Sequence, residues 1–141
     1  MSQVAVVAAQ WHADLVERMV QAFVPPVRAA GHEVEVLRVP GSFEIPFQVR
    51  RLARSGGCAA VAACGLVVDG GIYRHDFVAA TVVDALMRVQ LECDVPVLSG
   101  VLAPHHFHEH ADHLAFFDAH LVGKGEELAR SCLAVLPERP R

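Results

Sequence analysis

The residues best suited to chemistry lie where an apolar stretch ends in a glycine pair and a helical pattern begins. Arg74 and His75 come shortly after Gly70 and Gly71. An arginine can hold a phosphate, and a histidine can transfer a proton near neutral pH. The glycines let the backbone approach a ligand, and the start of a helix offers unpaired N–H groups to an anion. The segment is therefore either an anion-binding, proton-transferring site or an ordinary connection between a strand and a helix.

Two other segments carry side chains suited to ligand binding. Trp11 follows an apolar run and could stack on a planar heterocycle, or it could seal the edge of a core. Glu44 could accept hydrogen bonds from a polyol that the backbone of Ser42 and Phe43 also contacts, or it could favour the positive end of the next helix. We favour stacking for Trp11, whereas both roles can hold together for Glu44.

The segment from 105 to 113 is rich in histidine, and His106, Glu109 and His110 spell the inverted zinc-peptidase pattern. A catalytic zinc needs a third protein ligand and a fixed surrounding shell, and that pattern belongs to large peptidases. We therefore favour solvent-facing helix histidines, some near a substrate phosphate, over metal ligands. The sequence contains no Walker loop, C-x-x-C, Gly-x-Ser-x-Gly or dinucleotide-binding glycine motif.

The composition limits the class of protein. A chain of 141 residues fits one domain, 1–141, and 53% hydrophobic against 20% charged residues is rich for a small monomer, which favours a homo-oligomer. The net charge of -4 argues against nucleic acid as a partner. No apolar run reaches the roughly 20 residues that span a bilayer, and no leader pattern opens the chain. We expect a cytoplasmic protein that does not contact a membrane.

The four cysteines form no C-x-x-C pair and fall within apolar segments. Such cysteines are typical of reduced core thiols rather than disulfides or metal ligands. The residues in question are Cys58, Cys64, Cys93 and Cys132.

Apolar runs and helical spacings alternate along the chain. They predict four strands, over 3–9, 34–39, 58–68 and 96–102, with the third at the sheet centre. Helices are expected from Asp14 as N-cap, kinked or shortened at Pro25–Pro26, and then over 47–54, 76–92, 104–120 after its first turn, and 125–136. Right-handed crossovers then give an α/β fold, a three-layer α/β/α domain with a four-stranded parallel sheet, flavodoxin-like in kind.

Ligands of such sheets bind beyond the carboxyl ends of the strands. The segments that leave those ends are 10–12, 41–44, 69–75 and 103–106. They contain the tryptophan, the glutamate, the glycine pair and the histidines described above. The sequence therefore predicts one site at that edge of the sheet.

Several motifs resemble lumazine synthase, the penultimate enzyme of riboflavin synthesis, over nearly the whole chain. They are Val39 to Pro46, Gly65 to Gly71, Val89 to Glu92 with Val95 to Leu102, and Gly123-Lys124-Gly125. The start Trp11 to Asp14, the segment Asp69 to Phe77 and the segment Pro104 to Glu109 are similar to the second bacterial type of this enzyme. That type is associated with decamers of two pentamers rather than capsids of sixty subunits.

The resemblance implies condensation of 5-amino-6-ribitylaminouracil with 3,4-dihydroxy-2-butanone 4-phosphate, with no metal or redox cofactor, and a functional link to riboflavin synthase. Trp11 would then stack on the pyrimidine. The ribityl chain would be held by Ser42, Phe43 and Glu44, the ring edge lined by Leu66, Val67 and Val68, and the phosphate bound by backbone N–H groups of Gly71 and Ile72.

The chain departs from the usual members of that family. They have an arginine at the position of Asp69, a threonine near Ile72, and an aromatic residue at the position of Ser99. Their catalytic histidine aligns with Arg74, one place before His75. By its chemistry His75 is the expected proton carrier, with Arg74 as a phosphate or charge-stabilising partner, whereas alignment alone selects Arg74.

The usual phosphate-binding arginine falls near His113, so phosphate affinity could be weaker, with Lys124 and His120 as compensating groups. A weakly catalytic or non-catalytic paralogue that binds lumazine or flavin is therefore the alternative to the enzyme. A small metal-dependent hydrolase that uses the histidine group is the third hypothesis.

Overall fold

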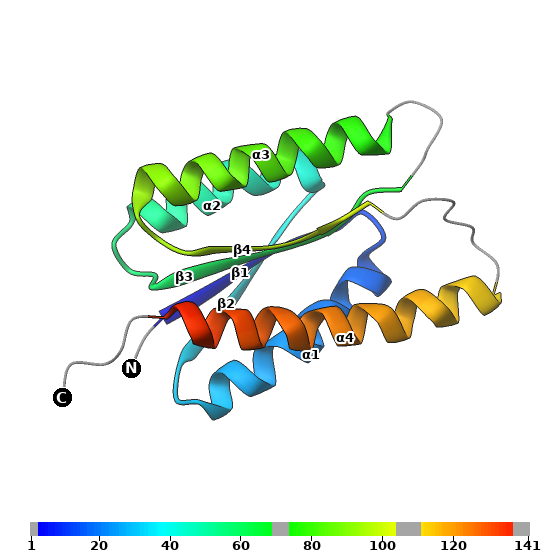
Figure 1. Cartoon of the computed structure of the whole chain (residues 1–141), viewed down its shortest axis with the longest axis horizontal. Helices are drawn as coiled ribbons and strands as arrows, with labels where there is room; N and C mark the ends of the chain where they lie inside the picture. Colours follow the sequence, from blue (N-terminus) through cyan, green and yellow to red (C-terminus); the bar gives the residue numbers. More distant parts are fainter. Residues whose placement is uncertain (1–2, 69–73, 104–110, 137–141) are drawn as a thin grey trace.

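A computed structural model of the chain describes residues 3–68, 74–103 and 111–136, the last range with side chains from 115 onward. Four parallel strands form one sheet in the order β2-β1-β3-β4. Helices α2 and α3 cover one face of the sheet, and α1 and α4 cover the other (Figure 1). The elements in chain order are β1 (Gln3–Ala9), α1 (Ala13–Ala29), β2 (Glu33–Val39), the short 3-10 helix η1 (Ser42–Glu44), α2 (Ile45–Arg54), β3 (Ala60–Leu66), α3 (His75–Cys93), β4 (Val97–Leu102) and α4 (Ala111–Val135).

This arrangement confirms the predicted three-layer α/β/α fold, and the strand order 2-1-3-4 is the flavodoxin-like one. The two central strands, β1 and β3, are runs of small and β-branched apolar residues. Val6 of β1 pairs with Val36 of β2 on one side and with Ala62 of β3 on the other. Every residue of β3 is buried, because helices cover both faces of the sheet. The predicted central position of the third strand is therefore confirmed.

Helix α1 differs from its prediction at its start and at its two prolines. It runs through Pro25 and Pro26 without stopping and ends at Ala29. Its buried stripe continues beyond the prolines to Val27, so packing against the sheet outweighs the lost backbone hydrogen bonds. The N-cap is His12, in a left-handed conformation, and not Asp14. Asp14 lies in the first turn, where its charge favours the helix dipole.

The two helices predicted over 104–120 and 125–136 are one helix, α4, within the part of the chain that the structure describes. Gly123 and Gly125 lie inside it. A Cβ at Gly125 would collide with the main-chain oxygen of Met19 and would lie 2.7 Å from the Cβ of Ala22 on α1. Gly125 therefore allows the backbones of α1 and α4 to approach closely. The contact with α1 keeps α4 helical across Gly125.

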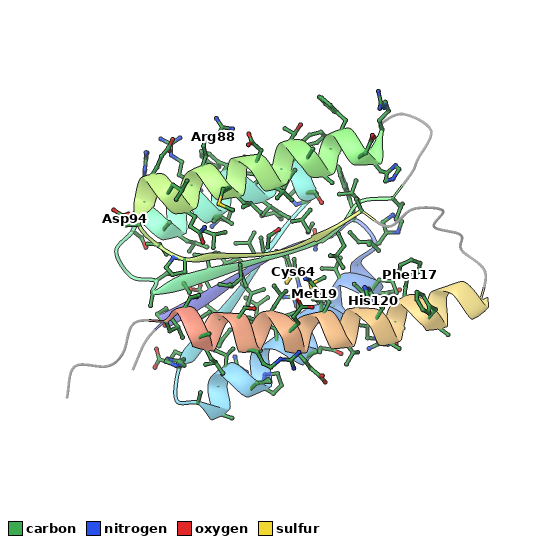
Figure 2. The ribbon with its side chains drawn as sticks, in the orientation of Figure 1. Met19, Cys64, Arg88, Asp94, Phe117 and His120 are labelled. Atoms are coloured by element: carbon green, nitrogen blue, oxygen red, sulfur yellow. The ribbon has the colours of Figure 1, made fainter. Side chains whose placement is uncertain are left out.

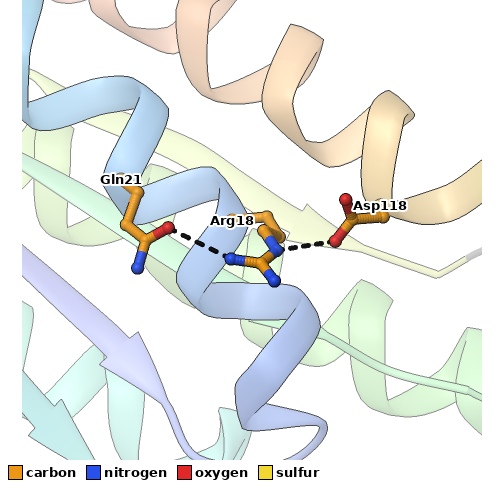
Figure 3. A network of polar contacts seen from close by, with 3 residues as sticks. All are labelled: Arg18, Gln21 and Asp118. Atoms are coloured by element: carbon orange, nitrogen blue, oxygen red, sulfur yellow. Dashed lines mark hydrogen bonds and ion pairs between the residues drawn. The ribbon is translucent and has the colours of Figure 1, made fainter. Parts of the chain in front are cut away.

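A polar contact accompanies this apolar packing between α1 and α4. The Nε of Arg18 donates to Oδ1 of Asp118 at 2.7 Å, and its Nη1 donates to Oε1 of Gln21 at 3.3 Å (Figure 3). Both charged side chains are about half exposed, so the pair contributes at most about 1 kcal/mol. The apolar residues between the helices supply most of the attraction; among them Phe23, Leu121 and Cys132 are fully buried.

The sheet separates the core into two apolar clusters, one under each pair of helices. Cys64 and Cys132 are buried in the cluster under α1 and α4, and Figure 2 shows Cys64 and Met19 between the sheet and α4. Burial raises the pKa of the Cys64 thiol to about 12 and that of Cys132 to about 11. Cys58 and Cys93 are partly buried under α2 and α3, and all four cysteines are free thiols.

Among the described residues, no helix is both long enough and apolar enough to cross a membrane.

Replacement of the two α4 glycines by alanine tests the close helix contact. Gly125→Ala should lower the free energy of unfolding by about 1–3 kcal/mol. Its methyl group would collide with backbone atoms of Met19, which cannot move away as a flexible side chain can. Gly123→Ala is the matched control, since a Cβ there meets nothing within 4 Å, and it should raise stability by up to ~1 kcal/mol. Urea unfolding measures both, and equal stabilities of the two variants would contradict the proposed contact.

Candidate functional site

The carboxyl ends of the four strands lie together at one edge of the sheet, on the right in Figure 1. Hydrogen bonding between β1 and β2 continues one residue beyond β1, where the N–H of Gln10 donates to the carbonyl of Val39, the last residue of β2, at 3.0 Å. Trp11 follows Gln10, and Gly41 lies two residues after Val39. The parallel pairing therefore delivers the two segments that leave β1 and β2 to the same place, as predicted.

Trp11 and Phe43 form an aromatic corner at this edge. Their ring centroids are 6.0 Å apart, and the ring planes are nearly perpendicular at 84°. Trp11 is partly buried and packs against the cluster under α2 and α3, whereas Phe43 is 41% exposed. The N–H of Glu44 donates to the carbonyl of Gly41 at 3.2 Å, which closes the turn that carries Phe43. Glu44 itself is exposed at the start of α2.

Ser42 packs against the end of β3. Its side chain is fully buried, and a Cβ at Gly65 would lie 3.0 Å from its Oγ and 3.2 Å from the Cδ1 of Ile45. The bare backbone of Gly65 therefore makes room for η1. The Ser42 hydroxyl has no hydrogen-bond partner within the ranges that the structure describes.

The residues after β3 face both layers of the fold. Val67 packs into the cluster under α2 and α3, on the same side as Trp11. Leu66 and Val68 pack into the cluster under α1 and α4. Of the three residues predicted to line the ring edge, Val67 alone presents its side chain on the tryptophan side. Leu66 and Val68 could serve a ligand there through their backbone.

Arg74 and His75 begin α3, on the same face of the sheet as the aromatic corner, and η1 contacts α3. The Nη2 of Arg74 donates to Oδ2 of Asp76 at 3.2 Å, and the arginine side chain is 83% exposed. The backbone N–H of Phe77 and then the guanidinium of Arg74 lower the pKa of the Asp76 carboxyl. Arg74 and Asp76 thus form an exposed ion pair at the start of the helix. His75 is partly buried.

The remaining predicted site residues are more scattered. Ser99 lies in β4 opposite Ala63, three residues before the strand ends. Lys124 lies on α4, where its Nζ is 3.4 Å from a carboxylate oxygen of Glu127. Figure 2 shows His120 and Phe117 on α4 as well, across the sheet from α3. Within one chain the structure therefore does not bring Lys124 or His120 to the aromatic corner.

His120 lines a separate cavity of about 210 Å³ between the ends of β3 and β4 and α4. Its ring also stacks on Phe116, with centroids 6.1 Å apart. Asp69, Gly71, Ile72 and the histidine pattern at 106–110 lie outside the described residues, as does the side chain of His113. Within the described ranges, no group of three or more His, Cys, Asp or Glu residues could hold a metal ion.

Sequence reasoning missed two contributors to this edge. They are Gly41 and Gly65, each of which has another residue packed against its bare backbone. The residues beside them in sequence, Pro40 and Leu66, do not indicate these contacts. The contacts depend on which side chain the fold places next to each glycine.

Comparison with known proteins supplies a family. A model of the 6,7-dimethyl-8-ribityllumazine synthase family matches residues 1–138. A protein of that name from Rhodococcus erythropolis is 53% identical over 92% of this chain and 85% of its own length. Proteins named 6,7-dimethyl-8-ribityllumazine synthase 2 are 47% identical in Pseudomonas syringae pv. tomato and 50% identical in Bradyrhizobium diazoefficiens. Each match covers 95% of this chain, and 81% and 82% of the respective relative.

Ser42→Ala tests the buried hydroxyl. Because this hydroxyl has no described partner, its removal should leave the free energy of unfolding unchanged or raise it by up to ~1 kcal/mol. Ser55→Ala is the contrasting control, because the Oγ of Ser55 donates to the carbonyl of Leu52 at 2.6 Å and accepts from the N–H of Gly57 at 3.1 Å. It should cost about 1 kcal/mol in the same urea titration. A clear loss of stability in Ser42→Ala would reveal a partner for that hydroxyl in the fold.

Proposed function

The chain belongs to the 6,7-dimethyl-8-ribityllumazine synthase family, and on that premise we propose how the carboxyl edge of its sheet carries out the reaction. The chain is a transferase of riboflavin biosynthesis. In our proposal it condenses 5-amino-6-ribitylaminouracil with 3,4-dihydroxy-2-butanone 4-phosphate, and 6,7-dimethyl-8-ribityllumazine, phosphate and water are released. The supporting observation is that the Trp11–Phe43 corner and the start of α3 lie on one face of the sheet at that edge.

The aromatic corner suits the pyrimidine substrate. Trp11 stacks on the planar ring, and the exposed Phe43 borders it. Glu44, exposed beside Phe43, accepts hydrogen bonds from hydroxyls of the ribityl chain. Because the side chain of Ser42 is buried, the backbone of Ser42 rather than its hydroxyl contacts the same chain.

The proton carrier is His75. Imine formation, loss of phosphate and ring closure each require protons to move, and a residue can carry them only if it changes its charge near neutral pH. A guanidinium stays protonated throughout that range, so Arg74 cannot act as a base. Its exposed position, paired with Asp76, suits attraction of the phosphate substrate instead. In our proposal the backbone N–H groups of Gly71 and Ile72 complete the phosphate site.

Copies of this chain assemble into a pentamer or a decamer of two pentamers. Support comes from the outer face of α2 and α3, where four large apolar side chains are more than half exposed: Phe47, Phe77, Met87 and Leu91. Such a patch is unusual on a small monomer. A groove of about 270 Å³ between α2 and α3 runs beside Phe47 and Arg88. In such an assembly, Lys124, His120 and His113 of one copy could reach the phosphate site of another.

The alternative, a weakly catalytic or non-catalytic paralogue that binds lumazine or flavin, receives no support from the comparisons, since the relatives all carry the synthase name. A cytoplasmic location and a functional link to riboflavin synthase stay predictions.

Kinetics of two neighbouring variants test the division of roles. His75→Ala should lower kcat by about a hundredfold or more, because it removes the group that moves protons. Arg74→Ala should mainly raise KM for the phosphate substrate, by about tenfold, because it removes a charge that attracts the substrate. Formation of the lumazine from both substrates, followed by absorbance, measures both variants.

The control for these variants is Arg54→Ala, an exposed arginine at the far end of α2, which should leave both constants unchanged. Addition of a chelator should also leave turnover unchanged, whereas loss of activity would favour a metal-dependent hydrolase. If His75→Ala kept full turnover while Arg74→Ala abolished it, the assignment of the proton carrier would be wrong.

The mass of the protein in solution tests the assembly. Light scattering should give five or ten times the chain mass of 15.2 kDa. Leu91→Asp should lower that mass, because it places a charge on the apolar face of α3. Val135→Asp, at an exposed apolar position near the end of α4, is the matched control and should keep the assembly intact. A monomer mass for the unaltered chain would refute the proposal.

A further inference from the structure

The indole of Trp11 lies face-on against the backbone of Gly41. A Cβ built on Gly41 would collide with the indole Cε2 and would lie only 2.5 Å from Cζ2 and 2.6 Å from Nε1. Cζ2 and Nε1 are the two ring atoms bonded to Cε2 on this side of the indole. Because they are nearly equidistant and both farther away than Cε2, the Cβ position lies over the face of the ring and not beyond its rim.

The requirement for glycine at this position is one of space and not of backbone conformation. Gly41 has φ of -152° and ψ of -178°, an extended conformation that any residue can adopt. The volume that a side chain would need is occupied by the indole. Glycine is therefore needed at position 41 because of Trp11.

Sheet register places the two residues opposite each other. Ala9 pairs with Val39, and the ladder ends with the hydrogen bond from Gln10 to Val39. Trp11 and Gly41 each lie two residues beyond that last pair. The indole is then bounded on a second side by Phe43, whose ring is perpendicular to it.

We propose that Gly41 is a positioning residue that fixes one face of the Trp11 indole against the backbone, so that the substrate ring stacks on the opposite face. The stacking of the substrate ring rests on the proposed function, whereas the position of the indole does not. The absence of a side chain at position 41 thereby sets the place of the stacking surface in the pocket and the fit of the heterocycle.

Fluorescence of Gly41→Ala tests the positioning directly. Trp11 is the single tryptophan of the chain, so the intrinsic emission reports on this ring alone. The added methyl group should push the indole away from the backbone, with a shift of the emission maximum and stronger quenching by acrylamide. Gly57→Ala is the matched control at the other end of the sheet, where a Cβ meets only the Oγ of Ser55 at 3.6 Å, and its emission should equal that of the unaltered protein.

Kinetics test the consequence for the substrate. Gly41→Ala should raise KM for the pyrimidine substrate by about tenfold, with kcat and KM for the phosphate substrate unchanged, because a stacking contact contributes to binding and not to the chemical step. A merely structural role would lower the amount of active protein without this separation of the two substrates. Gly57→Ala should leave all constants unchanged.

Measurements in the Trp11→Ala background separate the positioning of the indole by Gly41 from a general folding defect. There Gly41→Ala should change the unfolding free energy little, because the ring that it collides with is absent. A double variant that folds where Gly41→Ala alone does not would support the proposal. A folded Gly41→Ala with unaltered emission and KM, or an equal loss of stability in both backgrounds, would overturn it. Absence of lumazine synthesis by the unaltered protein would refute the proposed function, while the spectral shift would still decide the positioning.

Discussion

Parallel pairing of β1 with both β2 and β3 is the interaction on which the rest of the structure depends. It aligns the ends of three strands. Trp11, the 41–44 turn and Val67 therefore reach one edge of the sheet although they are far apart in the sequence. The pairing is stable because helices cover both faces of β1 and β3, whose small and β-branched residues pack well when fully buried. A register shift of one residue would turn each side chain to the other layer and would separate the aromatic corner.

Three glycines show how this fold brings groups into contact. At Gly125 the missing side chain admits the backbone of α1, at Gly65 it admits Ser42 and Ile45, and at Gly41 it admits the indole of Trp11. In each case glycine is needed for the space that the neighbouring residue occupies and not for its own backbone conformation. Two of these contacts lie at the carboxyl edge, where they place η1 and Trp11 with little freedom. A preorganised surface of this kind would lose less entropy when the planar substrate stacks on it as we propose.

The sheet also divides the molecule into two halves with different surface groups. The half with α2 and α3 carries the aromatic corner, the start of α3 and most of the exposed large apolar side chains in the described ranges. The half with α1 and α4 is closed by close helix packing and by the Arg18–Asp118 pair, and it carries Lys124 and His120. Charged groups that suit a phosphate therefore lie on both sides of the sheet. This separation supports our proposal that one copy contributes to the pocket of another.

The sequence by itself determined the four strands, the parallel three-layer architecture and the sheet edge at which we propose the site, because buried strands and amphipathic helices leave periodic patterns along the chain. It also selected Trp11 and Glu44 by residue type. Only the tertiary structure decided that α1 continues through Pro25 and Pro26 and that α4 is one helix across Gly125, since both depend on packing energy supplied by a neighbouring element. It alone showed Trp11 against Gly41, because contacts between paired strands depend on register and volume, which no local pattern encodes.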